Sequence, residues 1–399
     1  MQVRNLTVLI FCQLISTTGS IVMVTLGGIV GAELSTNKAL ATLPLSVMVI
    51  AVAASTVPAT LLMRKIGRRK SFSIASLTSV LALTIAVLAL RYSSFLGFNI
   101  AVMLFGVNMA FTYQYRYAAA ESVASRFVPR AISLVLVGSI GAAVVGKELA
   151  TRGQYWVADV PYAGTMVALA ALFALQAMLF QLMVPVGKQL QSNDDDTGRP
   201  LREIVRQPLF RVAVLGATTG FGLMTLIMTA TPLSMHINDH FSLEQTASVI
   251  RAHVLGMYLP SLVTGFLIER LGVSKLMFAG ALGLLIAVAV GLQGHTLLHY
   301  WWALVLLGVS WNFLYVGGTT MLTYSYRASE RFRAQALNEF LIFGSSALAS
   351  LLAGAVLHYF GWGTLMLIPV PFLLLICTAL ILVRRHPRLQ RVKLRGSET

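Results

Sequence analysis

The chain has 399 residues, of which 57% are hydrophobic and only 11% carry a charged side chain. Soluble globular proteins carry about 25% charged residues, so this composition, with a mean hydropathy of +0.79, excludes an ordinary soluble enzyme. The net charge of +16 would suggest a nucleic-acid partner in a soluble protein. In a membrane protein the location of the charges matters more than their sum, and the sequence indicates an integral membrane protein.

Twelve apolar segments follow one another along the chain, each long enough for a transmembrane helix. They are expected at residues 6–33, 40–62, 71–91, 95–121, 131–152, 161–185, 209–234, 246–268, 275–294, 298–323, 333–358 and 361–383. None alternates with a period of two residues, so a β-barrel is disfavoured, and helices are the remaining way to satisfy every backbone group in lipid. We expect an all-α polytopic membrane protein with 12 transmembrane helices.

A polar stretch that contains the acidic run Asn193–Gly198 separates the sixth segment from the seventh. We therefore expect an N-terminal six-helix half over residues 1–186 and a cytoplasmic linker over residues 187–207. A C-terminal six-helix half over residues 208–384 and a basic cytoplasmic tail over residues 385–399 complete the predicted organisation.

Lys and Arg residues are distributed unequally between the two sides of the membrane. If the N-terminus is cytoplasmic, 24 of the 30 lie on the cytoplasmic side, three lie on the opposite side and three lie within predicted spans. An excess of basic residues marks the cytoplasmic side, so both termini are expected there. Because these charges are spread over every cytoplasmic loop as an orientation signal, we do not expect nucleic acid as a partner.

The loops after the second and the eighth segment are similar to each other. Residues 64–70 read RKIGRRK and residues 269–275 read ERLGVSK. An offset of 205 maps Lys65 onto Arg270 and Gly67 onto Gly272. Because the offset spans six helices, the halves have the same orientation and form two parallel six-helix repeats. Transporters with this architecture place the substrate site between the halves.

Over essentially its whole length the chain resembles the major facilitator superfamily. That family has a loop between helices 2 and 3 of the form G-x-x-x-D-R/K-x-G-R/K-R/K. The second half of this chain matches the loop at Gly265, Glu269, Arg270, Gly272 and Lys275. The first half keeps Lys65, Gly67, Arg68 and Arg69, but has Thr60 for the glycine and Arg64 for the acid. The resemblance implies the twelve-helix fold and a secondary transporter that works by alternating access.

The resemblance also implies a role for the loop acid, which in the family lies against the start of helix 11 and helps to latch the cytoplasmic side. Here Arg64 inverts the sign of that position, and the eleventh segment carries Glu339. We hypothesise that Arg64 and Glu339 form the latch with exchanged charges. The alternative is that Arg64 is one more basic residue at the cytoplasmic surface.

Ionisable groups inside a span cost about 2.5–3.5 kcal/mol, so each needs a partner or a function. The candidates are Arg116, Glu121, Lys147, Glu148, Arg251, His253 and Glu339. Glu121 is expected to pair with the basic loop at Arg68 or Arg69. Arg116 lies among tyrosines and suits a carboxylate or aromatic substrate, although a place in the same cytoplasmic ion-pair network is an alternative.

Glu148 and Arg251 are expected at the same depth, in the outer thirds of helices 5 and 8. We hypothesise that they form an extracellular-side gate, and that Glu148 carries the proton because apolar surroundings raise the pKa of a carboxyl group. A permanent structural ion pair is the alternative. In the resembled family, the glycine-rich face of helix 5 packs against helix 8; here that face is predicted to hold Gly138, Gly141 and Gly146.

Asn108 and Asn312 lie near mid-membrane in corresponding spans and could donate to a solute, with interhelical hydrogen bonding as the alternative. Tyr258, Trp311 and Tyr315 could add aromatic walls, although core packing is the default. The histidine pairs His236 and His240, and His295 and His299, have a spacing that could bind a transition metal. Exposed loop histidines are the preferred interpretation, so neither a metal nor a cofactor is expected.

The predicted protein is thus a secondary transporter and not an enzyme, driven by a proton or ion gradient. The resemblance is closest to the drug and metabolite exporters of the family, which favours proton-coupled export of a small organic solute, anionic or drug-like. Uptake of an organic anion and a non-transporting receptor are the alternatives. A monomer in the lipid bilayer of a bacterial inner membrane is expected.

Overall fold

The computed structural model describes residues 3–36, 43–157, 159–184, 198–235 and 239–384. In the first half of the chain the helices are α1 (Val3–Leu34), α2 (Leu43–Ile66), α3 (Arg68–Arg91), α4 (Phe95–Thr112), α5 (Tyr115–Glu121), α6 (Val128–Arg152) and α7 (Ala163–Gln181). In the second half they are α8 (Leu201–Arg206), α9 (Pro208–Leu233), α10 (Leu243–Tyr258), α11 (Ser261–Leu271), α12 (Val273–Gln293), α13 (Leu297–Thr323), α14 (Arg331–Leu367) and α15 (Pro369–Val383).

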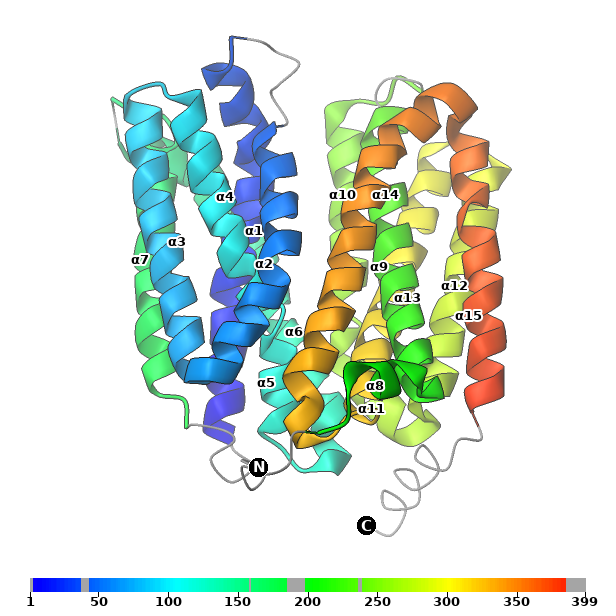
Figure 1. Cartoon of the computed structure of the whole chain (residues 1–399). Coiled ribbons are helices and arrows are strands. Elements are labelled where there is room, and N and C mark those ends of the chain that lie inside the picture. The colour runs from blue at the N-terminus through cyan, green and yellow to red at the C-terminus, as the bar shows by residue number, and fades with distance from the viewer. Residues whose placement is uncertain (1–2, 37–42, 158, 185–197, 236–238, 385–399) are drawn as a thin grey trace. The chain divides into compact units, whose positions relative to one another are not determined.

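The helices form two compact units (Figure 1). One consists of Met1–Ser122 and Val135–Leu190, and the other of Val123–Leu134 and Gln191–Thr399, so α6 begins in the second unit and continues in the first. In the first unit α4 packs against α2 and α3, and α3 also packs against α7. In the second unit α13 packs against α9, α10 and α12, while α9 also packs against α14.

The twelve predicted spans account for the observed α-helices except the short α8, which lies in the predicted linker. Among the described residues, ten helices are long and apolar enough to cross a membrane, and the pair Ser248–Tyr258 and Ser261–Leu271, bent by 40°, adds one more. One of the ten, Ala328–Val383, has 56 residues. At about 1.5 Å per residue it is far longer than the roughly 30 Å of a bilayer core. Gly361, with φ 76°, interrupts α14, and Figure 1 shows the chain turning back there into α15.

The internal repeat is visible in two equivalent glycines. Gly67 and Gly272 precede α3 and α12 and have φ values of 82° and 94°. Glycine adopts such positive φ values without the steric penalty that other residues meet. The two glycines are related by the predicted offset of 205, and so are the first residues of the helices that follow them. The two parallel six-helix repeats and the all-α fold are thereby confirmed.

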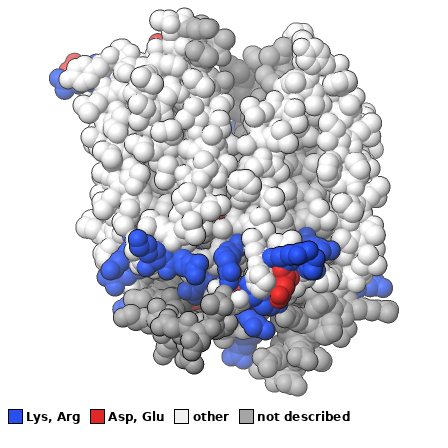
Figure 2. Space-filling view, viewed as in Figure 1, with Lys and Arg blue, Asp and Glu red and all other residues white. Residues whose placement is uncertain are grey.

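The surface of the helices is apolar along their length and basic at one end. On α3, Ile74, Leu77, Leu81 and Leu88 are exposed, which is the pattern of a face that contacts lipid. In each unit, the Lys and Arg side chains on the drawn face gather mainly at one end (Figure 2). We call it the basic end of that unit; the α2–α3 loop lies at the basic end of the first unit, and the α11–α12 loop lies at the basic end of the second.

Candidate functional site

Five aromatic side chains from α9, α10, α13 and α14 meet inside the second unit. We call them the aromatic cluster, which consists of Phe221, Tyr258, Trp311, Tyr315 and Phe343. The rings of Trp311 and Tyr315 are stacked, with centroids 4.7 Å apart and an interplanar angle of 18°. The ring centroid of Phe221 lies 5.3–5.6 Å from the ring centroids of Trp311, Tyr315 and Phe343. The structure thus brings together the three aromatic residues singled out in the sequence and adds two phenylalanines.

The indole of Trp311 brings an N–H group into this cluster. Its side chain is 2% exposed, and its Nε1 has no hydrogen-bond partner among the described residues. Buried tryptophans usually find an acceptor for this N–H. The N–H group is therefore available to an acceptor other than the described part of the chain.

Asn312, the next residue of α13, is fully occupied by the protein. Its Nδ2 donates to the backbone oxygen of Met257 and to the hydroxyl of Ser261, both at 2.7 Å. Its Oδ1 accepts a hydrogen bond from the hydroxyl of Thr264 at 2.7 Å. These partners lie on both sides of the break between α10 and α11, near Pro260. The geometry favours the interhelical alternative for Asn312 over donation to a solute.

His253 lies on α10, fully buried against α13. Its Nδ1 is 2.8 Å from the backbone oxygen of Leu304. A carbonyl oxygen can only accept, so Nδ1 carries the hydrogen, and in the neutral ring Nε2 is then an acceptor. Among the described residues, Nε2 has no partner. His253 therefore offers a buried acceptor on the same pair of helices as the Trp311 donor.

Glu339 lies on α14, four residues before Phe343, so both side chains share one face of the helix. Its side chain is fully buried, and its Oε1 accepts a hydrogen bond from Nδ2 of Asn338 at 2.9 Å. The structure thus places this carboxyl group one helical turn from the aromatic cluster.

Three candidate residues of the first unit surround the break between α4 and α5. Arg116 is buried, its guanidinium lies 4.7 Å from the ring centroid of Tyr117, and its Nη2 donates to the Tyr117 hydroxyl at 3.3 Å. Asn108 and Gln114 are fully buried, and neither side-chain amide has a hydrogen-bond partner among the described residues. The sequence analysis missed Gln114, although its position within a tyrosine-rich stretch of a predicted span could have indicated it.

The predicted contact of Glu121 with the basic loop is present. Arg68 donates from Nε and Nη2 to the two carboxylate oxygens of Glu121, at 2.8 and 2.6 Å. The pair is buried, with 5% and 11% of the side chains exposed. Arg69 instead donates to Gln181 at 3.0 Å. A bidentate ion pair with so little solvent exposure fixes the start of α3 to the end of α5.

The second copy of the loop makes a different contact. A Cβ atom on Gly265 would lie 2.7 Å from the Cα of Arg130 and 2.9 Å from the backbone oxygen of Pro129. Only glycine allows α11 to approach the start of α6 this closely. Arg130 pairs with Glu269 at 2.5 Å and lies 4.5 Å from the ring centroid of Phe266. Gly265 and Glu269 are thus contact residues, while Arg270, like Arg64 and Lys65, is exposed.

Glu148 is not in the apolar surroundings expected from the sequence. Its side chain is 47% exposed, and its carboxylate is 2.8 Å from Nε of Arg152, one turn along α6. The proton role expected of Glu148 stays a prediction. Arg251 is exposed, and the side chain of Lys147 lies outside the described residues. The Glu148–Arg251 and Arg64–Glu339 pairs would each join the two units, and both stay predictions.

The glycines of α6 pack against α1. In the first unit, Cβ atoms on Gly138, Gly141 and Gly146 would meet Ile10, Leu14 and Ile21 of α1. These glycines therefore serve the packing of α6 on α1, where small residues let two helices approach closely.

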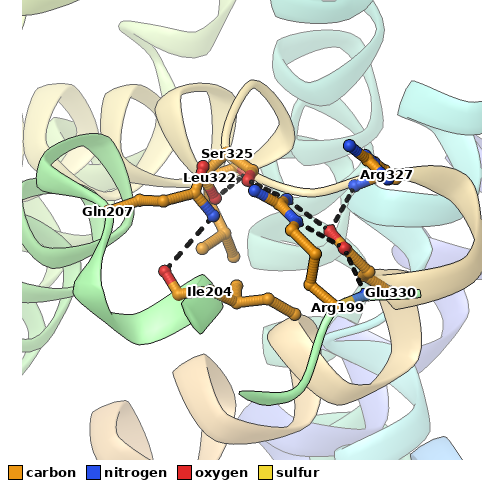
Figure 3. A network of polar contacts seen from close by, with 7 residues as sticks. All are labelled: Arg199, Ile204, Gln207, Leu322, Ser325, Arg327 and Glu330. Atoms are coloured by element: carbon orange, nitrogen blue, oxygen red, sulfur yellow. Dashed lines mark hydrogen bonds and ion pairs between the residues drawn. The ribbon is translucent and has the colours of Figure 1, made fainter. Parts of the chain in front are cut away.

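An ion pair that the sequence analysis missed fixes the end of the linker to the second unit (Figure 3). The fully buried carboxylate of Glu330 accepts hydrogen bonds from Nε and Nη2 of Arg199, both at 2.6 Å, and from the backbone N–H of Arg199 at 2.9 Å. The backbone N–H of Arg327 adds a fourth at 2.9 Å. Hydrogen bonding to Glu330 raises the pKa of Arg199 above its usual value, so this arginine stays charged.

One of the histidines considered as a metal ligand takes part in a hydrogen-bonded network instead. At the end opposite the basic end, Nδ1 of His295 lies 3.0 Å from the carboxylate of Asp239, which also accepts from the Tyr300 hydroxyl at 2.6 Å. His299 contacts Thr296 at 2.8 Å, and His236 lies outside the described residues. Among the residues that the structure describes, no three His, Cys, Asp or Glu side chains are grouped to hold a metal ion.

Comparison with known proteins gives a consistent result over the full chain. The family model described as Major Facilitator Superfamily matches residues 7–250 and 224–398. The riboflavin transporter RfnT of Brucella anthropi is 36% identical over 380 residues, which cover 95% of each chain. The uncharacterized MFS-type transporter YdeG of Bacillus subtilis is 29% identical over 398 residues, with 92% of this chain and 91% of that protein covered.

Solved structures of low sequence identity share the fold. The fucose:proton symporter FucP of E. coli has a TM-score of 0.73 at 15% identity, covering 95% of this chain and 97% of that chain. The human organic anion transporter MFSD10 has a TM-score of 0.75 at 13% identity, covering 94% of this chain and 99% of that chain.

Proposed function

The chain belongs to the Major Facilitator Superfamily, a family of membrane transporters rather than enzymes, and we propose that the solute it carries is riboflavin or a closely related flavin. The similarity to a riboflavin transporter, over nearly the whole length of both chains, is the observation that carries the proposal. At this level of identity the fold is shared, while the substrate has to be tested.

The aromatic cluster supports a planar heteroaromatic solute. Flat conjugated rings stack on aromatic side chains at centroid separations of about 4.5–7 Å, and Trp311 and Tyr315 already stack in this way. Ligand sites in proteins combine apolar and aromatic walls with a few polar groups that orient the ligand. Trp311 and His253 would supply such polar groups in the second unit, and Asn108, Gln114 and Arg116 in the first.

Coupling to protons belongs to the proposal as well, with Glu339 in place of Glu148 as the carrier. An ionisable group in the interior of a membrane protein typically marks an ion or proton pathway. Glu339 is fully buried and lies one turn from Phe343 of the aromatic cluster, so protonation and solute binding would affect neighbouring groups. Export is the direction favoured from the sequence, and uptake is the alternative.

The proposal places the protein in a bacterial inner membrane as a monomer, with the basic end in the cytoplasm. Basic loops mark the cytoplasmic side of bacterial membrane proteins, and on the drawn face the Lys and Arg side chains gather mainly at one end of each unit (Figure 2). Two of the relatives are bacterial proteins.

The test is a flux measurement in proteoliposomes that contain the purified protein. Riboflavin is loaded inside or supplied outside under a pH gradient of either sign, and its movement is followed by fluorescence. We expect saturable movement that depends on the gradient, and its direction identifies export or uptake. The variant Phe221→Leu should lose most of this movement, while Phe360→Leu, at an exposed site, should retain it. Riboflavin movement no faster than in protein-free liposomes would refute the proposal.

A further inference from the structure

Two buried polar atoms in the second unit have opposite hydrogen-bonding character and no partner among the described residues. They are Nε1 of Trp311 and Nε2 of His253. More than about 90% of buried polar groups in proteins are paired, so each exception needs an explanation. An indole N–H can only donate, and Nε2 of His253 accepts because Nδ1 donates to Leu304. On α10 and α13 the second unit therefore offers a donor and an acceptor that no described residue pairs.

The two residues belong to one packed surface. His253 lies on α10 and Trp311 on α13, two helices that pack against each other. Leu304, the contact of His253, and Trp311 are seven residues apart on α13, which is about two turns, so both face α10. Between them is Gly308, where a Cβ atom would lie 2.5 Å from the backbone oxygen of His253. Helical side chains lean toward the N-terminus of their helix, so the Trp311 indole leans toward the level of His253.

We infer that Trp311 and His253 recognise the pyrimidine-dione end of the flavin, an inference that rests on the proposed function. That end of the ring system carries one imide N–H between two carbonyl groups. Nε2 of His253 accepts the imide N–H, and Nε1 of Trp311 donates to a neighbouring carbonyl oxygen. The ring of Tyr315 stacks on the ring of Trp311, and the ring of Phe221 packs against Trp311 in an edge-to-face arrangement.

This arrangement discriminates by hydrogen bonding rather than by shape. A site that hydrogen-bonds a substrate group rejects analogues without it far more strongly than an apolar pocket rejects a missing methylene, because the buried protein group is left unpaired. Both atoms are covered in the present structure, so the solute reaches them when a local movement of α10 and α13 within the second unit uncovers them. Through Trp311 and His253, the second unit distinguishes the flavin ring from its analogues.

The test compares the binding of riboflavin and of three analogues to purified wild type and variants, and binding is followed by flavin fluorescence. In 3-methylriboflavin the imide donor is absent, and in 4-thioriboflavin or 2-thioriboflavin a carbonyl oxygen is replaced by sulfur, a weak acceptor. Losing a hydrogen bond to a buried group corresponds to at least about fivefold in Kd. Wild type should bind 3-methylriboflavin and one thio analogue at least about fivefold more weakly than riboflavin.

The variants assign each effect to its residue. In His253→Leu the preference for riboflavin over 3-methylriboflavin should disappear, while His253→Gln, which retains an acceptor, should keep part of it. Trp311→Phe keeps an aromatic ring without the N–H, and it should lose only the discrimination against the thio analogue. Trp302→Phe, an exposed tryptophan on the same helix, is the matched control, and thermal unfolding verifies that each variant is folded.

The possible failures are separable. If wild type does not bind riboflavin, both the proposed function and this inference are overturned. If wild type binds riboflavin but the analogues bind equally well, only the recognition by these two residues is overturned. The same holds if His253→Leu and Trp311→Phe change stability while leaving both preferences intact, which is the result expected when buried waters satisfy the two atoms.

Discussion

Removing the Arg199 side chain should destabilise the second unit strongly, although this residue lies in the linker and outside every span. Glu330, its partner, is fully buried and accepts four hydrogen bonds, three of them from Arg199. In Arg199→Ala both side-chain bonds are lost, and the carboxylate is left buried with only backbone donors. Breaking one partner of a buried ion pair costs about 3–5 kcal/mol.

The expected change in melting temperature follows from this magnitude. For a domain of 150–250 residues, about 1 kcal/mol shifts Tm by about 2–4 °C, so Arg199→Ala should lower Tm by about 6–20 °C. The measurement is thermal unfolding of the purified protein in detergent. The matched control is Arg202→Ala, an exposed arginine on α8 whose loss changes the charge equally. It should shift Tm by no more than about 2 °C, since surface substitutions usually change stability by less than about 0.5 kcal/mol.

The double variant Arg199→Ala/Glu330→Gln separates the ion pair from other effects. Because glutamine removes the uncompensated charge, the double variant should be more stable than Arg199→Ala alone, with a coupling of about 0.5–3 kcal/mol. The reasoning is refuted if Arg199→Ala and Arg202→Ala unfold at the same temperature, or if the two effects simply add. Either result would mean that the linker is held by α8 packing rather than by its arginine.

Three further predictions concern the loops and the proton. Gly265→Val should block the approach of α11 to Arg130 and Pro129 and abolish transport, whereas Gly344→Val, where nothing lies within 4 Å of the added Cβ, should transport normally in the same flux assay. Arg68→Lys should lose one of the two hydrogen bonds to Glu121 and lower the free energy of unfolding by about 1–3 kcal/mol. Denaturant unfolding measures this change, and Arg64→Lys, at an exposed site, is the control. Glu339→Gln should abolish proton-linked flux and Glu148→Gln should leave its pH dependence unchanged, so the opposite outcome would restore Glu148 as the carrier.

The fold could be predicted from the sequence because its determinants are local and repeated. Apolar length gives each span, and the glycines at positions 67 and 272 mark equivalent turns with positive φ. The break at Gly361 coincides with the predicted start of the last span. None of these features depends on which distant residue a side chain contacts.

The site could be predicted only in part, because it depends on such distant partners. Glu121 with Arg68 was foreseen, since a carboxylate at the end of a span has few basic residues within reach. Glu330 with Arg199 was not, because 131 residues separate them and nothing in the local sequence marks either as buried. The exposure of Glu148 could not be predicted either, because residue counting gives depth along a helix, while the face of the helix decides exposure.

A comparison of the two halves explains why Asn108 and Asn312 differ, and it makes a prediction. A Cβ on Gly106 would meet the backbone oxygen of Met48, and one on Gly308 would meet that of His253. The two carbonyls are 205 residues apart and the two glycines 202, because α12, with 21 residues, is three residues shorter than α3, with 24. By this alignment Asn108 corresponds to Ser310, and Asn312 to Ala110.

The two asparagines are therefore not equivalent, and their removal should have opposite consequences. Asn312→Ala leaves the Met257 oxygen and the Ser261 and Thr264 hydroxyls without their partner, and should cost about 1–3 kcal/mol of stability. Asn108→Ala removes an amide with no partner among the described residues, so it should leave stability within about 0.5 kcal/mol or raise it, while weakening binding of a solute that reaches helix α4. Denaturant unfolding and flavin binding measured on both variants decide the matter. Equal losses of stability would show that Asn108 is also held by the protein, and would remove it from the candidate site.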